Sequence, residues 1–338
     1  MTNTVAQAGT STDGVSPDSA STDSTSPESG ATFADQPQRQ GIATARVASG
    51  VFLAIGGTFL FALKSILIKF AFAAGCNTMT LLALRMVLSC PFYVAMYLYL
   101  YRPRTERARP PLRASLYALI LGFFGYYLAS YLDMAGLEHI SAQLERITLF
   151  TYPTIIAVLA WMFLRETLNA RIIASLALSY LGIAVMAFQE RSTTATGQVT
   201  VGVLLVLGSA VSYSLYVLFA KPLMQRIGSR EFTSLAMIGS TVFVVVHFLT
   251  TQTWSSLTLS PVILLYALLL AFVCTVIPSF LINEAIVRLG ATRTTIIGSV
   301  GPVLTSILAV VILQEPTSIY HLIGVVCVIV GVSLVATK

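Results

Sequence analysis

The sequence predicts an all-α polytopic membrane protein, with ten transmembrane helices arranged as two inverted five-helix repeats. Three observations carry this prediction: an apolar composition, an internal repeat, and positive charges confined to alternate loops. The chain is 56% hydrophobic and only 10% charged, whereas soluble domains are about 25% charged. Its mean hydropathy is +0.83. A soluble globular fold is therefore excluded.

Apolar segments long enough to cross roughly 30 Å of hydrocarbon recur along the chain. Short polar or glycine-containing breaks separate them, and the shallowest breaks fall at 136–140 and 286–290. The ten predicted spans lie near residues 47–72, 78–100, 114–135, 141–164, 170–188, 201–220, 232–250, 260–282, 291–313 and 319–336.

Residues 1–40 have a different composition, rich in Ser, Thr, Pro, Gly and Asp and almost without large apolar side chains. Such a segment cannot bury enough apolar surface to fold, so we expect a disordered cytoplasmic tail. A regulatory or partner-binding tail is the alternative. No basic segment followed by an apolar segment opens the chain, so we expect no cleaved secretory signal.

Two parts of the chain match at a fixed offset of 149 residues. The match includes a proline inside an apolar span, a glutamate that follows the span and a glycine in the next one. Two unrelated apolar segments rarely share this pattern, so we expect one unit used twice, over residues 47–188 and 201–336. Ala142, Ile147, Pro153, Ala160, Leu164, Glu166 and Gly182 recur as Ala291, Ile296, Pro302, Ala309, Leu313, Glu315 and Gly331.

Positive charge is distributed unevenly between alternate loops. Fifteen of the 20 Lys and Arg residues fall on one side of the predicted membrane and only Arg191 on the other; four lie within spans. The positive-inside rule then places both termini in the cytoplasm. Because each repeat has five spans, an odd number, the second repeat enters the membrane from the opposite side. Inverted repeats of this kind are typical of carriers that work by alternating access.

The repeated prolines predict interrupted helices. Pro153 and Pro302 each lie about eleven residues into their span, and proline removes an intrahelical hydrogen bond. Paired interruptions at corresponding positions indicate a transport site, so we include Thr151 and Tyr152 beside Pro153. The alternative is that the prolines only shape helix packing.

Further polar and aromatic residues fall on single helical faces of other spans. A polar face inside hydrocarbon should face protein or water, and either a cavity or close helix packing explains it. The candidates for a substrate cavity are Tyr126, Tyr213, Tyr216, Ser279, Asn283 and Ser299.

Ionisable residues inside spans are costly and indicate function by default. By their positions along the spans, five of them cluster in the outer half of the first repeat: Lys64, Arg85, Asp133, Glu145 and Arg146. They are candidates either for binding a charged substrate or coupling proton, or for ion pairs that close a periplasmic gate. We expect Asp133 and Glu145 to pair with Arg85, Lys64 or Arg146.

Other residues receive weaker assignments. Glu284, near the inner end of the eighth span, is a secondary candidate for carrying a proton. Glu166 and Glu315 are expected to cap or pair with neighbouring loops. Gly182 and Gly331 are expected to allow close packing within a scaffold or at a dimer face.

Catalytic and metal-binding motifs are absent from the sequence. No CxxC, HExxH or GxSxG motif occurs, and neither does a Walker lysine motif. We therefore expect no cofactor, no bound metal and no catalytic residues. The expected partners are a small-molecule substrate and membrane lipids but no nucleic acid, and a homodimer is left open.

Several segments resemble a known family. Ser141–Arg146, Phe150–Pro153 and Glu166, with the copy running from Gly290 through Pro302 to Glu315, resemble an EamA repeat of the drug/metabolite transporter superfamily. The stretches 63–69 and 80–86 are similar to a bacterial subgroup of that family. The second copy departs from the first because it lacks equivalents of Arg85, Glu145 and Arg146.

The resemblance implies a secondary transporter, an exporter of small metabolites or drugs, in the bacterial cytoplasmic (inner) membrane. The alternatives are a membrane-embedded enzyme, or a lipid-moving or structural membrane protein. Substrate, direction and coupling ion are left open.

Overall fold

The computed structural model describes the backbone of residues 36–101, 110–165, 167, 169–193, 198–252, 260–289, 294 and 297–336. Residues 1–35 of the predicted tail lie outside this range, and α1 already begins at Gln36. Ala45–Lys338 forms one compact unit, which contains all the features described below.

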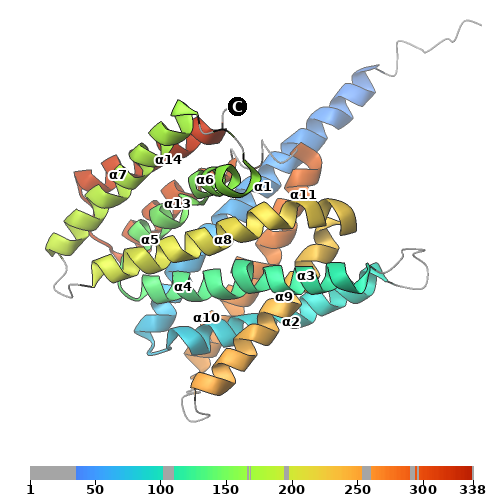
Figure 1. The fold of residues 1–338 in the computed structure, drawn as a ribbon, viewed down its shortest axis with the longest axis horizontal. Coiled ribbons are helices and arrows are strands. Elements are labelled where there is room, and N and C mark those ends of the chain that lie inside the picture. The colour runs from blue at the N-terminus through green and yellow to red at the C-terminus, as the bar shows by residue number, and fades with distance from the viewer. Residues whose placement is uncertain are drawn as a thin grey trace, which may run out of the picture. The chain divides into compact units, whose positions relative to one another are not determined.

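All the regular secondary structure of the described residues is helical, which confirms the predicted fold class (Figure 1). Eight helical stretches are long and apolar enough to cross a membrane, and two shorter apolar helices complete the ten predicted spans. The elements are α1 (Gln36–Ala73), α2 (Thr78–Leu100), α3 (Leu112–Gly122), η1 (Phe123–Leu128), α4 (Ala129–Leu137), α5 (Ala142–Leu149), α6 (Tyr152–Leu164), α7 (Ala170–Thr193), α8 (Val199–Ile227), α9 (Ser229–Thr251), α10 (Pro261–Ala271), η3 (Phe272–Val276), α11 (Ile277–Leu289), α13 (Gly301–Leu313) and α14 (Ile319–Ala336).

The predicted interruption of the fourth span is confirmed, and it is sharper than a bend. α5 ends at Leu149, two residues form a turn, and α6 begins with Pro153 in its first turn, where proline fits because its missing N–H has no helical partner. In the second repeat α13 likewise begins with Pro302 in its first turn. Both half-helices are 13 residues long and start 149 residues apart, at Tyr152 and Gly301.

A second pair of irregularities was not predicted. The third span contains a π-helical segment, η1, and the eighth contains another, η3. They begin at Phe123 and Phe272, again 149 residues apart. A π-helical turn inserts one residue and shifts the side chains that follow it, and such turns are frequent at functional sites. Periodicity in the sequence does not reveal them because they leave the apolar composition of the span unchanged.

Helices α7 and α14 lie side by side (Figure 1), and the glycines predicted for close packing belong to this contact. A Cβ on Gly182 would lie 2.8 Å from the carbonyl oxygen of Gly324, and one on Gly331 would lie 2.5 Å from Ser179 Oγ. The Ser175 hydroxyl donates a hydrogen bond to the carbonyl of Gly331. These residues therefore join the two repeats within one chain.

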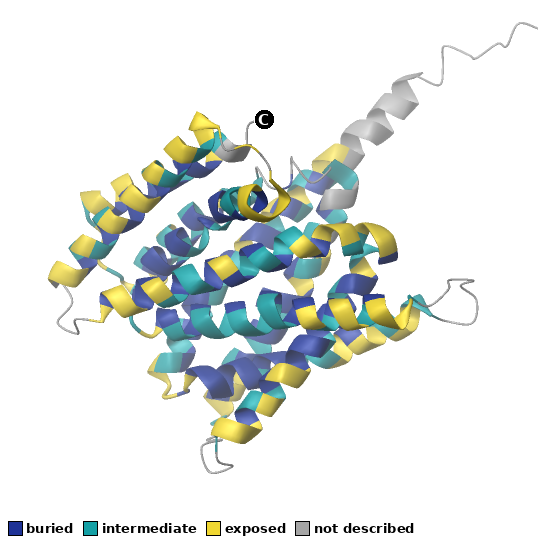
Figure 2. Cartoon of the chain, in the orientation of Figure 1, coloured by how far each residue is buried: buried dark blue, intermediate teal, exposed yellow. Residues whose placement is uncertain are grey.

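Burial follows the helix faces that meet each other (Figure 2). Large apolar side chains such as Phe52, Leu112 and Phe188 remain exposed on outward faces. In a protein whose spans are apolar all round, these faces are suited to contact lipid. Some of the buried polar side chains, among them Arg85, Asp133 and Thr275, line a cavity.

Candidate functional site

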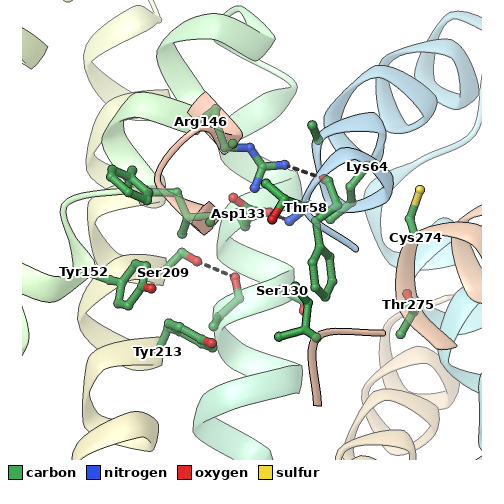
Figure 3. Close-up of a pocket in the computed structure, with 18 of the residues that line it drawn as sticks. Thr58, Lys64, Ser130, Asp133, Arg146, Tyr152, Ser209, Tyr213, Cys274 and Thr275 are labelled. Carbon is green, nitrogen blue, oxygen red and sulfur yellow. Dashed lines mark hydrogen bonds and ion pairs between the residues drawn. The ribbon is translucent and has the colours of Figure 1, made fainter. Parts of the chain in front are cut away.

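A cavity of about 410 Å³ lies among helices of both repeats (Figure 3). This volume is within the range of roughly 300–1,000 Å³ typical of small-molecule sites. From the first repeat, α1, α2, η1, α4 and the interrupted fourth span line it. From the second, α8, η3, α11 and the start of α13 line it.

The structure brings most, but not all, of the predicted site residues to this cavity. Those that line it are Tyr126, Tyr152, Tyr213, Ser279, Pro302, Lys64, Arg85, Asp133 and Arg146. Those outside its lining are Thr151, Pro153, Tyr216, Ser299, Glu145 and Glu284. The side chain of Asn283 lies outside the described residues.

Lys64 and Asp133 form an ion pair across α1 and α4, as expected. Lys64 Nζ lies 2.6 Å from Asp133 Oδ2, and the side chains are 14% and 3% exposed. Figure 3 shows the two side chains pointing toward each other at the edge of the cavity. At this depth the pair neutralises both charges, because an isolated charge in such surroundings is expensive.

Glu145 and Arg146 are joined through a serine that the sequence analysis did not single out. Ser65 donates a 2.6 Å hydrogen bond to Glu145 Oε2 and accepts one of 3.0 Å from Arg146 Nη2. Arg146 also donates to the carbonyl of Phe61 at 3.0 Å. Glu145 is fully buried and adjoins the carboxyl group of Asp133. The expected pairing of Glu145 with Arg146 is thus made through Ser65. The position of Ser65 on α1, four residues before Lys69, does not indicate this role in the sequence.

Arg85 does not pair with a carboxylate among the residues that the structure describes. Its Nε donates to Thr275 Oγ1 at 3.0 Å, and that hydroxyl in turn donates to the carbonyl of Leu270 at 2.8 Å. Arg85 is 6% exposed, and its Nη1 has no hydrogen-bond partner in the described part of the chain. Thr275 belongs to the π-helical segment η3, so this irregular part of the eighth span holds the guanidinium.

Aromatic rings form the opposite part of the lining. The rings of Tyr152 and Tyr213 are 5.3 Å apart at centroid and nearly perpendicular, and those of Tyr126 and Tyr216 are 5.1 Å apart. Tyr216 donates a 3.0 Å hydrogen bond to the hydroxyl of Tyr126. Tyr216 therefore acts behind the lining, where it fixes the position of a tyrosine that faces the cavity.

The half-helices α6 and α13 both begin at the cavity. Tyr152, at the first position of α6, and Gly301 and Pro302, at the first positions of α13, are part of the lining. A helix N-terminus carries a partial positive charge of roughly half an elementary charge. Interrupted helices that direct such ends at a central site are characteristic of secondary transporters.

Two glutamates hold the start of α5 at one end of the cluster of charges. Glu315 accepts hydrogen bonds from the backbone N–H groups of Ala142, at 2.8 Å, and Gln143, at 3.4 Å. Glu190 accepts from the N–H of Ser141 at 2.6 Å and from its hydroxyl at 2.7 Å. The capping role expected for Glu315 is confirmed; Glu190 was missed, since a lone glutamate at the end of a span is common. Glu166 lies outside the described residues.

Glu284 lies away from the cavity. It pairs with Arg288 on its own helix at 2.9 Å and with Arg230 at 3.9 Å, and its side chain is 37% exposed. Among the described residues there is no group of three or more His, Cys, Asp or Glu that would hold a metal ion.

The fold and the cavity together define a membrane transporter: ten helical spans in two repeats, with a central polar and aromatic cavity at paired helix breaks. The chain belongs to the EamA-like transporter family, whose model matches residues 48–188 and 200–337. It is accordingly a multi-pass membrane protein of the drug/metabolite transporter superfamily, and members of this family are transporters, not enzymes.

Individual relatives agree with this membership. The chain is 29% identical to the uncharacterized transporter YcbK of Bacillus subtilis (strain 168), over 82% of this chain and 89% of that protein. It is 26% identical to a WAT1-related protein of Arabidopsis thaliana, over 82% and 86% of the two chains. A crystal structure of a protein 14% identical superposes with a TM-score of 0.57, over 85% of this chain and 96% of the other. That likeness shows the fold.

Proposed function

We propose that this protein is a secondary carrier that exports small metabolites or drugs across the bacterial cytoplasmic membrane by alternating access. The observation that carries the proposal is a cavity that both repeats line at the points where their helices are interrupted. A molecule bound there contacts both halves of the protein. Rocking of one repeat against the other would then move access from one side of the membrane to the other.

The charged residues at the cavity edge support a role in gating. Lys64–Asp133 ties α1 to α4, and the contacts of Arg146 with Phe61 and Ser65 tie α5 to α1. Glu315, from the second repeat, holds the start of α5 in the first. We propose that these contacts close the periplasmic end and separate during transport, with both termini in the cytoplasm as the loop charges indicate.

The α7–α14 contact bears on oligomeric state. Gly182 and Gly331 pack inside the chain, so we do not propose a homodimer through them.

Solute movement into and out of vesicles tests the carrier function. The full-length protein, purified and reconstituted, is expected to give saturable movement of a subset of solutes that does not require ATP. Arg85→Ala and Glu145→Ala are expected to reduce this movement while inserting normally. Comparison of medium and cell metabolites between an overexpressing strain and a strain without the gene would identify the exported class. The absence of saturable movement of any solute in that class would overturn the proposal.

A further inference from the structure

The charges around the cavity do not balance, and the imbalance concerns Arg85. The cluster consists of three cations (Lys64, Arg85 and Arg146) and two carboxylates (Asp133 and Glu145). Four of these five groups are joined in two pairs. Lys64 is paired with Asp133, and Glu145 is linked through a hydroxyl to Arg146. Within the described part of the chain, no carboxylate lies within ion-pair distance of Arg85.

Arg85 is also incompletely hydrogen bonded in a place where this is costly. The residue is 6% exposed, lines the cavity and keeps its Nη1 without a partner. A buried charged donor left without a partner costs more than a neutral one. Thr275 holds the Nε edge at 3.0 Å, so the guanidinium is already oriented while part of its donor set remains free.

Two further features make the cavity electropositive. The N-termini of α6 and α13 both open onto it, and each adds a partial positive charge. Asp133, the carboxylate in the lining, is occupied by Lys64 at 2.6 Å, and Glu145 does not reach the lining. Asp133 Oδ1 has no hydrogen-bond partner among the described residues, but an organic cation would have to compete with Lys64 for that carboxylate.

The rest of the lining is suited to a ring. Tyr126, Tyr152 and Tyr213 present aromatic surface, and Phe61 and Phe150 add two further rings. Aromatic pairs prefer offset-stacked or edge-to-face contacts, and the perpendicular arrangement of Tyr152 and Tyr213 offers both ring faces and ring edges.

From these observations we infer that the carrier's substrates are small aromatic monocarboxylates, with the carboxylate bound by Arg85 and the ring held among the tyrosines. The inference rests on the proposed carrier function and specifies the substrate class of the same cavity. Arginine suits this role because its planar donor array matches the two oxygens of a carboxylate. One bound carboxylate would neutralise Arg85, which has no carboxylate within ion-pair distance among the described residues.

A charge series on one ring tests the inference directly. Phenylacetate, 2-phenylethanol, phenethylamine and L-phenylalanine supply an anion, a neutral alcohol, a cation and a zwitterion on the same ring. Equilibrium binding of radiolabelled phenylacetate to the full-length protein in detergent micelles, with the other three as competitors, gives their ranking. Phenylacetate is expected to bind tightest and phenethylamine weakest, and this ranking on the unsubstituted protein needs no variant.

Variants then assign the carboxylate site. Arg85→Gln is expected to weaken phenylacetate binding about 10- to 100-fold, the loss of a hydrogen-bonded charge partner, with little effect on 2-phenylethanol. Arg85→Lys keeps the charge without the planar donor array and should fall between the two. Arg191→Gln removes an exposed arginine of α7 and should bind like the unsubstituted protein.

Several results would overturn the inference. They are undetectable phenylacetate binding, a ranking that places phenethylamine or L-phenylalanine at or above phenylacetate, and an anion preference that survives Arg85→Gln. If vesicles containing the protein still show saturable movement of other solutes, the carrier function stands and only the substrate class fails. If no solute moves, the carrier function itself fails.

Discussion

The Lys64–Asp133 ion pair makes a quantitative prediction about stability. The two charged atoms are 2.6 Å apart, and their attraction at an effective dielectric constant of about 20 is worth about 6 kcal/mol before desolvation is subtracted. Removing one partner of a buried pair leaves the other charge uncompensated, which costs about 3–5 kcal/mol. Because Lys64 is 14% exposed at the cavity edge, we expect the lower end, about 3 kcal/mol, for either Lys64→Met or Asp133→Leu.

The double variant separates the interaction from the individual side chains. Replacing both charges by apolar residues leaves no unpaired charge, so the double variant should be about 2 kcal/mol more stable than the sum of the single effects predicts. The assay is the free energy of unfolding in detergent for all four proteins. The exposed pair Glu284–Arg288, at 32–37% side-chain exposure, is the matched control and should show a coupling of only about 0.5 kcal/mol. Additive single effects, or a coupling no larger than that of the control pair, would refute the reasoning.

Three other features make separate predictions. Glu315→Gln should lower the free energy of unfolding by about 1–2 kcal/mol and slow transport, because it weakens the acceptors for the first N–H groups of α5. The control is Gln314→Asn, at a residue in a left-handed conformation that asparagine tolerates. Equal stability of the two variants would contradict the capping role. Gly182→Ala should destabilise the protein by about 1–3 kcal/mol, because the added Cβ would lie 2.8 Å from a carbonyl oxygen of α14. Gly56→Ala should be tolerated, because its Cβ would lie 3.9 Å from the nearest side chain. Thermal unfolding of the two variants tests the difference. Burial raises the pKa of the Cys76 thiol to about 11, and the thiolate is the reactive form. In a variant that keeps only this cysteine, the rate of maleimide labelling should therefore be low at neutral pH and still increase above pH 9. A rate that levels off below pH 9 would contradict the burial.

The sequence alone predicted the fold class and part of the site because both depend on local chemistry. Apolar length determines how many spans cross the membrane, and proline interrupts a helix wherever it stands. Pro153 and Pro302 therefore located the helix breaks that line the cavity. The rule that charges within spans face the protein interior led to Lys64, Arg85, Asp133 and Arg146 for the same reason.

The pairing of those groups could not be predicted, because it depends on distances between helices. The sequence allowed Asp133 and Glu145 several cationic partners, and only the packing of α1 against α4 assigns Lys64 to Asp133. The same packing places Ser65 between Glu145 and Arg146.

Composition and spacing along the chain were thus enough to predict the membrane class, the twofold repeat, the helix breaks and the intramembrane charges, because each of these is a property of the linear sequence. Tertiary structure decided which charges are neutralised and which is left over. Two π-helical segments, invisible in the pattern of apolar residues, turn Tyr126 and Thr275 into the cavity. Arg85 therefore binds a hydroxyl group and not a carboxylate. A shift of a few ångströms between helices that are distant in sequence decides whether a buried charge lies next to an opposite charge or next to a neutral dipole.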